Sequence, residues 1–177
     1  MKDKVSNRQK QASRTKKKIY DVSISLLKKY GFNNVSIADI SKNAGVSVGT
    51  FYHYFPSKND IIIEIFRQGD DYFKTVVAQN LKGETANEKI IGFFEYYADF
   101  NTSKGIDFVK HFYNAENKLF IKKNRYMQLL LQEIIKSGQD RHEITAEMTP
   151  EKITEILFVV VRGVIYDWCL HEGDYPM

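Results

Sequence analysis

The chain has 177 residues, of which 43% are hydrophobic and 27% are charged, as in ordinary globular domains. This composition excludes a disordered or collagen-like chain, and no apolar run reaches the ~18–20 residues of a membrane span. The single cysteine, Cys169, cannot form an internal disulfide, which favours a reducing cytoplasm.

The net charge of +4 is unevenly distributed along the chain. Residues 1–60 carry 12 Lys and Arg against 4 Asp and Glu, whereas residues 61–177 carry 14 against 18. A basic N-terminal third on an acidic remainder favours contact of one end with a polyanion. A solvated basic segment is the alternative.

The chain begins with a polar stretch, 1–12, that has no hydrophobic periodicity and is interpreted as a basic arm. Apolar residues then recur at helical spacing and predict a helix over 13–30, which Gly31 ends.

Two short helices are predicted next, over 37–44 and 48–55, with Gly45 between them. Ser36 and Ser47 stand where their side chains would cap the two helix N-termini. Short helices joined by a tight turn form a helix-turn-helix, and neither would be stable without packing on its neighbours.

The remaining periodic segments also predict helices and no competing strand. Their expected ranges are 57–81, 86–101, 106–113, 117–137 and 150–171. The predicted fold is therefore all-α. It has an N-terminal three-helix helix-turn-helix module and a C-terminal helical domain. The expected domains are 13–73 and 74–177.

The sequence IADISKNAGVSVGTFYHYFPSK, residues 37–58, resembles the TetR family of bacterial repressors. Ser41 replaces the usual small Ala and Phe51 the usual Leu, and the resemblance extends over about 13–73. It implies a homodimer in which the third helix of each copy enters a major groove of double-stranded DNA. It also implies a C-terminal domain that binds a small effector.

The third helix begins with small residues that would let it approach base edges closely, and Thr50 offers both a hydroxyl and a methyl group. The resemblance implies phosphate contacts for Tyr52, Tyr54 and Lys58, and base contacts for Val48, Gly49 and His53. The complete predicted DNA-binding set is Ser36, Ala38, Ser47, Val48, Gly49, Thr50, Tyr52, His53, Tyr54 and Lys58.

No Arg or Lys lies within 47–57, so this helix is not expected to read guanine through a bidentate contact. Affinity would come from Lys58, the arm and the run 16–18, with specificity from apolar contacts and DNA shape. Two alternatives stay open: a solvated face for 16–18, and partial core packing for Tyr52 and Tyr54.

Ten aromatic residues lie between Phe93 and Tyr126. Most must belong to the core, but their number favours a cavity for an apolar or aromatic effector. The residues predicted to line it are Phe94, Tyr97, Phe108, Phe112, Phe120 and Tyr126.

The last predicted helix contains six consecutive apolar residues, 156–161, which cover every direction around its axis. One side would face the domain core and the other a second copy of the chain. A fully central helix within its own domain is the alternative. The predicted interface comprises Val160, Gly163, Val164 and Trp168.

Signals for catalysis are poor, because neither the HE pair at 142 nor that at 171 is followed by a second His at metal spacing. We therefore expect no catalytic residue, metal or cofactor, and no membrane association. The sequence predicts a cytoplasmic, dimeric repressor released from DNA by a small, largely apolar effector. The alternative is a DNA-bound structural or cell-division adaptor with a protein partner and no effector.

Overall fold

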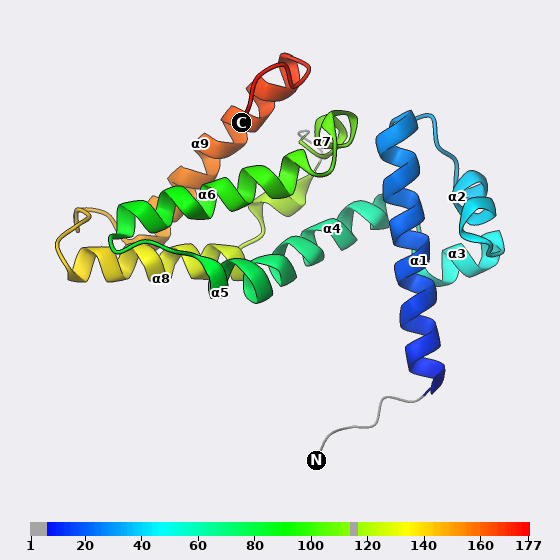
Figure 1. The fold of residues 1–177 in the computed structure, drawn as a ribbon, viewed down its shortest axis with the longest axis horizontal. Helices are drawn as coiled ribbons and strands as arrows, with labels where there is room; N and C mark the ends of the chain where they lie inside the picture. Colours follow the sequence, from blue (N-terminus) through cyan, green and yellow to red (C-terminus); the bar gives the residue numbers. More distant parts are fainter. Residues whose placement is uncertain (1–6, 114–116) are drawn as a thin grey trace. The chain divides into compact units, whose positions relative to one another are not determined.

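The computed structural model describes residues 7–113 and 117–177, and within them every regular element is helical (Figure 1). The chain divides into two compact units, Met1–Glu64 and Ile65–Met177. The all-α prediction is confirmed. The division between the units falls inside a helix, nine residues before the expected domain boundary at 73.

The first unit contains α1 (Asn7–Tyr30), α2 (Ile37–Ala44), α3 (Val48–Tyr54) and the start of α4 (Asn59–Tyr72). In Figure 1, α2 lies beside α1, and α3 lies beside α2. The buried residues of the two short helices and their ends include Ile40, Ala44, Phe51 and Phe55.

The predicted arm is wrong over residues 7–12, which are the first turns of α1. These residues are exposed or half-buried Asn, Arg, Gln, Lys and Ala, so they lack an apolar stripe although most of them favour helix. Hydrophobic periodicity reveals a helix only where one of its faces is buried, so it does not reveal the solvent-exposed first turns of α1. The rest of the predicted arm, 1–6, lies outside the described residues.

Local capping explains why α2 and α3 begin where they do. Ser36 and Asp39 form a capping box: the Ser36 Oγ accepts from the Asp39 amide at 3.1 Å, and Asp39 Oδ2 accepts from the Ser36 amide at 3.0 Å. The Ser47 Oγ accepts from the Thr50 amide at 3.0 Å. Gly45, with a φ of 64°, ends α2 in the left-handed conformation that favours glycine. The sequence-based N-caps are confirmed.

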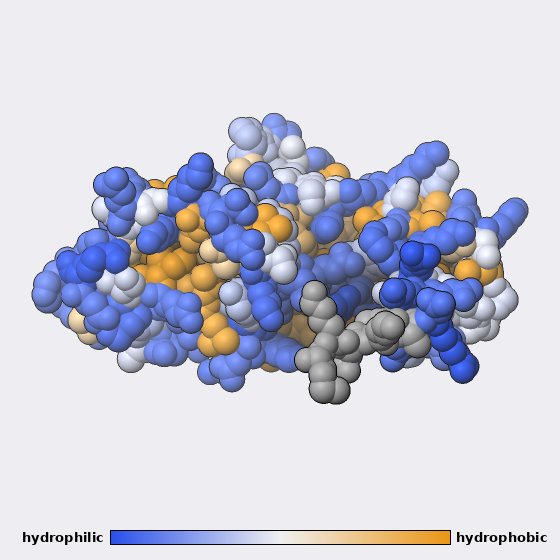
Figure 2. Space-filling view, turned by 60° about the horizontal axis from the view of Figure 1, so that its bottom comes forward, coloured by the Kyte–Doolittle hydropathy of each residue, from blue (hydrophilic) through white to orange (hydrophobic). Residues whose placement is uncertain are grey.

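The described part of the second unit contains the end of α4 and seven further elements. These are the π-helix η1 (Phe73–Val77), α5 (Ala78–Asn80), α6 (Ala86–Thr102), α7 (Ile106–Phe112), the 3-10 helix η2 (Lys118–Ile121), α8 (Tyr126–Asp140) and α9 (Pro150–Leu170). Helix α8 packs against both α6 and α9. On the face drawn in Figure 2, apolar side chains reach the surface among hydrophilic ones.

Two predicted helices differ from the observed ones. The helix expected over 57–81 contains the π-helical turn η1, and the helix expected over 117–137 begins only at Tyr126. Helix α8 also continues past Gly138, where it was expected to end. A Cβ atom at Gly138 would lie 2.5 Å from that of Ala86, so this glycine permits close approach of α8 and α6.

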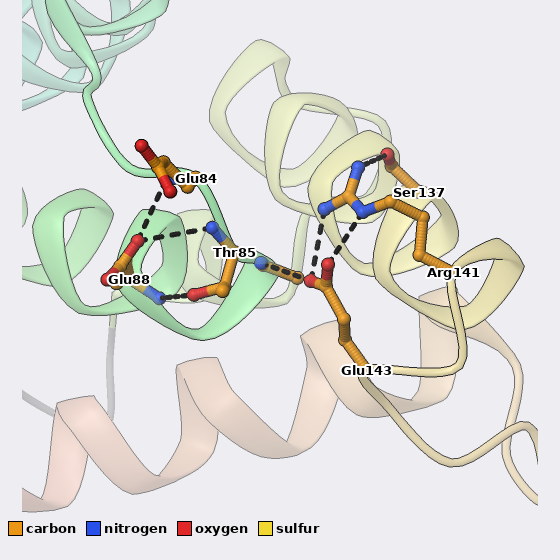
Figure 3. Close-up of polar contacts among 7 residues, drawn as sticks. Glu84, Thr85, Glu88, Ser137, Arg141 and Glu143 are labelled. Carbon is orange, nitrogen blue, oxygen red and sulfur yellow. Dashed lines mark hydrogen bonds and ion pairs between the residues drawn. The ribbon is translucent and has the colours of Figure 1, made fainter.

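A polar contact joins the start of α6 to the loop after α8 (Figure 3). The Glu143 carboxylate accepts from the Ala86 amide at 2.5 Å and from Nε and Nη2 of Arg141 at 2.7 and 3.0 Å. The Arg141 Nη1 donates in turn to the Ser137 Oγ at 2.7 Å. These hydrogen bonds, first those from Arg141 and then that from Ala86, lower the pKa of Glu143 to about 2.

We expect Glu143→Gln to lower the stability of the second unit at neutral pH, because the amide replaces an anion that accepts from a guanidinium. Because the pKa of Glu143 is lower in the folded chain than in the unfolded chain, its carboxylate stabilises the folded state at pH values above the unfolded pKa, near 4.5. This stabilisation is lost as the pH falls from there to about 2, the pKa in the folded chain. The difference in urea midpoint between the variant and the original chain should therefore shrink over that range.

The control is Glu147→Gln on the same loop, because the Glu147 side chain makes no hydrogen bond or ion pair with a described residue. This interpretation would be contradicted if the change in urea midpoint caused by Glu143→Gln did not depend on pH, or if it equalled the change caused by Glu147→Gln.

Candidate nucleic-acid interface and ligand hollow

Helix α3 turns one face to solvent. Val48 and Tyr52 are 43% and 50% exposed, and Gly49 and His53 are exposed beside them. At 100° per residue these four positions fall within about 140° of the helix circumference, opposite the buried Phe51. The outward face thus combines small residues with two polar-tipped rings, a surface that fits a groove lined with base edges.

The flanks of this face are engaged in local contacts. Thr50 and Tyr54 are half-buried, and the Thr50 and Ser47 hydroxyls hydrogen-bond each other at 2.8 Å. Ala38 and Ser36 are exposed at the start of α2, but the Ser36 hydroxyl donates to Asp39 at 2.5 Å. Ser36 and Ser47 can still contact DNA, but their hydroxyls already act as caps.

Lys58 has a structural role that the sequence analysis missed. Its Nζ donates to the Phe32 carbonyl at 2.6 Å and to the Val35 carbonyl at 2.9 Å, and lies 4.1 Å from the centre of the Phe32 ring. Burial lowers the pKa of this ammonium. Lys58 therefore ties the segment before α4 to the turn before α2. A third N–H remains for the predicted phosphate contact.

The three lysines at 16–18 have different surroundings: two form ion pairs within the first unit, and one is exposed to solvent. Lys16 pairs at 2.9 Å with Glu64, whose exposure is only 8%, and Lys17 pairs with Asp21 on the same helix at 2.5 Å. Lys18 is exposed and has no ion-pair partner among the described residues. The cationic surface of α1 that can meet a polyanion thus includes Lys18 and the exposed Arg8, Lys10 and Arg14.

Three of the six aromatic residues predicted to line an effector cavity belong to the core of the second unit. Tyr97, Phe108 and Phe112 are buried. The Tyr97 and Tyr113 hydroxyls hydrogen-bond each other at 2.9 Å, and Tyr113 donates to the Asn101 Oδ1 at 3.0 Å. Burial raises the pKa of both phenols, so they stay neutral. Of the six predicted residues, Phe120 borders the hollow described next.

A hollow of about 460 Å³ opens where η2, α8 and α9 meet. It is lined by Phe120, Ile121, Lys123, Asn124, Gln128, Gln132, Glu151, Thr154, Glu155, Phe158, Val159 and Arg162. A second, more open hollow of about 760 Å³ shares Phe120, Ile121 and Arg162 with it. From the sequence, this part of α9 was predicted to serve dimerisation alone. The feature of the sequence that could have indicated a ligand site here is Arg162, a charged residue directly after an apolar run.

Helix α9 also exposes an apolar stripe. Val159, Val160 and Val164 are half or nearly half exposed, and a Cβ atom at Gly163 would meet nothing within 4 Å. Trp168 does not belong to this stripe, which corrects its place in the predicted interface. It is buried, and its Nε1 donates to the Tyr175 carbonyl at 2.9 Å because the residues after α9 fold back over it.

Among residues 7–113 and 117–177, no helix combines the length and apolar character of a membrane span. The described part of the chain contains no group of three or more His, Cys, Asp or Glu side chains that could hold a metal ion.

Comparison with known proteins assigns the helix-turn-helix. The sequence model described as "Bacterial regulatory proteins, tetR family" matches residues 19–65, which include α2, α3, the second half of α1 and the start of α4. Residues 19–65 of the chain belong to the TetR family. The resemblance inferred from residues 37–58 is thereby confirmed.

The TetR-family relatives extend over most of the chain. The fatty acid metabolism regulator protein of Bacillus subtilis is 21% identical over 170 residues, covering 90% of this chain and 86% of the relative. The structure of the fatty acid degradation regulator FadR from Bacillus halodurans has a TM-score of 0.71 at 21% identity, covering 90% of this chain and 86% of that one. FadR of Thermus thermophilus, described as a repressor in complex with lauroyl-CoA, has a TM-score of 0.68 at 18% identity, covering 91% and 86%. These structures establish the shared fold.

We expect Lys58→Met to destabilise the first unit by about 1–3 kcal/mol, because the Phe32 and Val35 carbonyls lose a charged donor. Thermal unfolding followed by circular dichroism measures the effect. Lys42→Met, at an exposed lysine of α2, is the control. Equal unfolding temperatures for the two variants would leave Lys58 without a structural role.

Proposed function

We propose that this protein is a cytoplasmic transcriptional repressor that binds operator DNA as a homodimer and is released by a small effector. The observation that carries the proposal is the exposed face of α3, held outward by capped helix ends and a buried Phe51. Family membership and the cationic surface of α1 support the same function.

The effector is proposed to be small and largely apolar, and to bind in the second unit. Two features support this: a hollow with aromatic walls at Phe120 and Phe158, and two structural relatives, the FadR proteins of Bacillus subtilis and Thermus thermophilus, in complex with stearoyl-CoA and lauroyl-CoA. The adaptor alternative requires a filled interior. The rings around Tyr97 and Phe112 are closely packed, but the hollow beside Phe120 favours a sensor.

The homodimer is proposed to form through the apolar stripe of α9. An exposed row of valines beside an unobstructed glycine would allow two helices to approach closely. Two-fold pairing would place two α3 helices for half-sites about one helical turn of DNA (~34 Å), or a multiple of it, apart.

We expect Tyr52→Phe and His53→Ala to weaken operator binding by about tenfold each while leaving the fold unchanged, because both side chains are exposed on α3. The operator is first selected from a random DNA pool, and affinities are then measured by fluorescence anisotropy. Tyr30→Phe, at an exposed tyrosine at the end of α1, is the matched control. Equal affinities for Tyr52→Phe, His53→Ala and Tyr30→Phe would contradict the site.

We expect Val160→Asp to convert the dimer to monomers at micromolar concentration and to weaken operator binding with it, because a charge would enter an apolar contact. Sedimentation velocity measures the first effect. Val76→Asp tests an exposed valine outside the stripe and should leave the dimer intact. A Val160→Asp variant that remains dimeric would refute this interface.

A further inference from the structure

The hollow between η2, α8 and α9 has a charged end and an apolar middle. Phe120 and Phe158 contribute the aromatic wall, and Arg162 borders the hollow at the C-terminal end of the α9 segment that lines it. Glu151 borders it at the opposite end, eleven residues earlier on α9 and about 16 Å away along the axis. The two ends of the hollow therefore differ in charge.

Arg162 has an uncompensated positive charge within the described chain. The guanidinium carbon lies 5.9 Å from the centre of the Phe120 ring, and the side chain makes no hydrogen bond or ion pair with a described residue. The other cation of the hollow, Lys123, is paired with Glu155 at 3.2 Å. A half-buried guanidinium beside apolar walls is a site for a carboxylate or another planar anion.

Thr154 supplies an independent observation in the same hollow. The residue is only 2% exposed, and its Oγ1 has no hydrogen-bond partner among the described residues. Buried hydroxyls nearly always have a partner, because an unpaired one loses its bonds to water without replacement. Because this oxygen is closed to solvent, a polar group of a bound molecule would satisfy it after the Thr154 side chain rotates toward the hollow that the residue borders.

The spacing of the two groups sets the length of such a molecule. Thr154 and Arg162 are eight residues apart on α9, which corresponds to about 12 Å along the helix axis. Phe158 lies midway between them and is buried against the domain. A ligand that reaches both groups must therefore cross an aromatic surface.

We infer that the hollow binds an elongated, amphipathic organic anion, with its anionic group at Arg162 and a second, hydrogen-bonding group at Thr154. The inference rests on the proposed ligand-responsive function and adds the chemical class of the ligand. Its apolar segment, about 12 Å long, lies across Phe120 and Phe158.

The test measures binding of three probes to the full chain by isothermal titration calorimetry, without DNA. The probes are 10-hydroxydecanoate, which carries both polar ends, decanoate, which lacks the hydroxyl, and 1-decanol, which lacks the charge. We expect affinity to fall in that order. Arg162→Gln should remove the preference for decanoate over 1-decanol, a loss of about ten- to hundredfold for the acids.

Thr154→Val should remove only the preference for 10-hydroxydecanoate over decanoate, because valine keeps the shape of threonine without the hydroxyl. Arg67→Gln and Thr75→Val, at exposed positions outside the hollow, are the matched controls and should bind all three probes as the original chain does. Urea midpoints of the variants show whether each remains folded.

Equal binding of decanoate and 1-decanol to the original chain, or no binding of any probe, would overturn the inference. Operator binding measured in parallel without probe separates this result from a failure of the proposed function. A chain that binds DNA but not the anions refutes the ligand class alone. A chain that binds the anions through Arg162 but not DNA refutes the repressor alone.

Discussion

The position of α4 in the second unit depends on Arg125. Its Nε pairs with the Asp70 carboxylate at 3.1 Å, its Nη2 donates to the Phe66 carbonyl at 3.2 Å, and its guanidinium lies 4.5 Å from the centre of the Phe66 ring. The Arg125 side chain is 10% exposed, so its charge is largely removed from water. Such a charge is tolerated only with its partners in place. The start of α8 and the middle of α4 are therefore held together.

This contact has a functional consequence, because α4 begins in the unit that carries α3 and ends in the unit that carries the hollow. Phe66 contacts the rings of Phe112 and Phe120 at centre distances of 4.6 and 5.2 Å, and Phe120 is a wall of the hollow. A ligand against Phe120 would thus lie one ring away from α4. Under the proposed function, such a ligand would change operator affinity to the extent that it favours one position of α4 over another.

Local chemistry made most of the fold predictable. Ser36, Gly45 and Ser47 act on neighbouring residues, so their pattern located α2 and α3. The errors arose where a distant contact decides, or where a helix has no buried face to detect. Gly138 resembles a helix end but is a close-packing site against Ala86. Residues 7–12 are helical without a buried face.

The residues of the candidate sites also differ in whether the sequence predicts their role. The outward face of α3 follows from helical periodicity and the family motif, and four of its predicted residues are exposed together. The sequence does not predict the structural role of Lys58, because that role depends on carbonyls 23 and 26 residues away. Thr154 could not be singled out either, because its unpaired hydroxyl is visible only in the folded chain.

A double-mutant cycle tests the anchoring of α4 most directly. Urea unfolding of Arg125→Met, Asp70→Asn and the double variant is followed by fluorescence of Trp168, the single tryptophan, which lies in the second unit. The account predicts that each single variant is destabilised and that the double variant loses less than the sum, with a coupling of at least ~1 kcal/mol. Effects that add within about 0.5 kcal/mol would show that Arg125 and Asp70 act independently and would contradict the account.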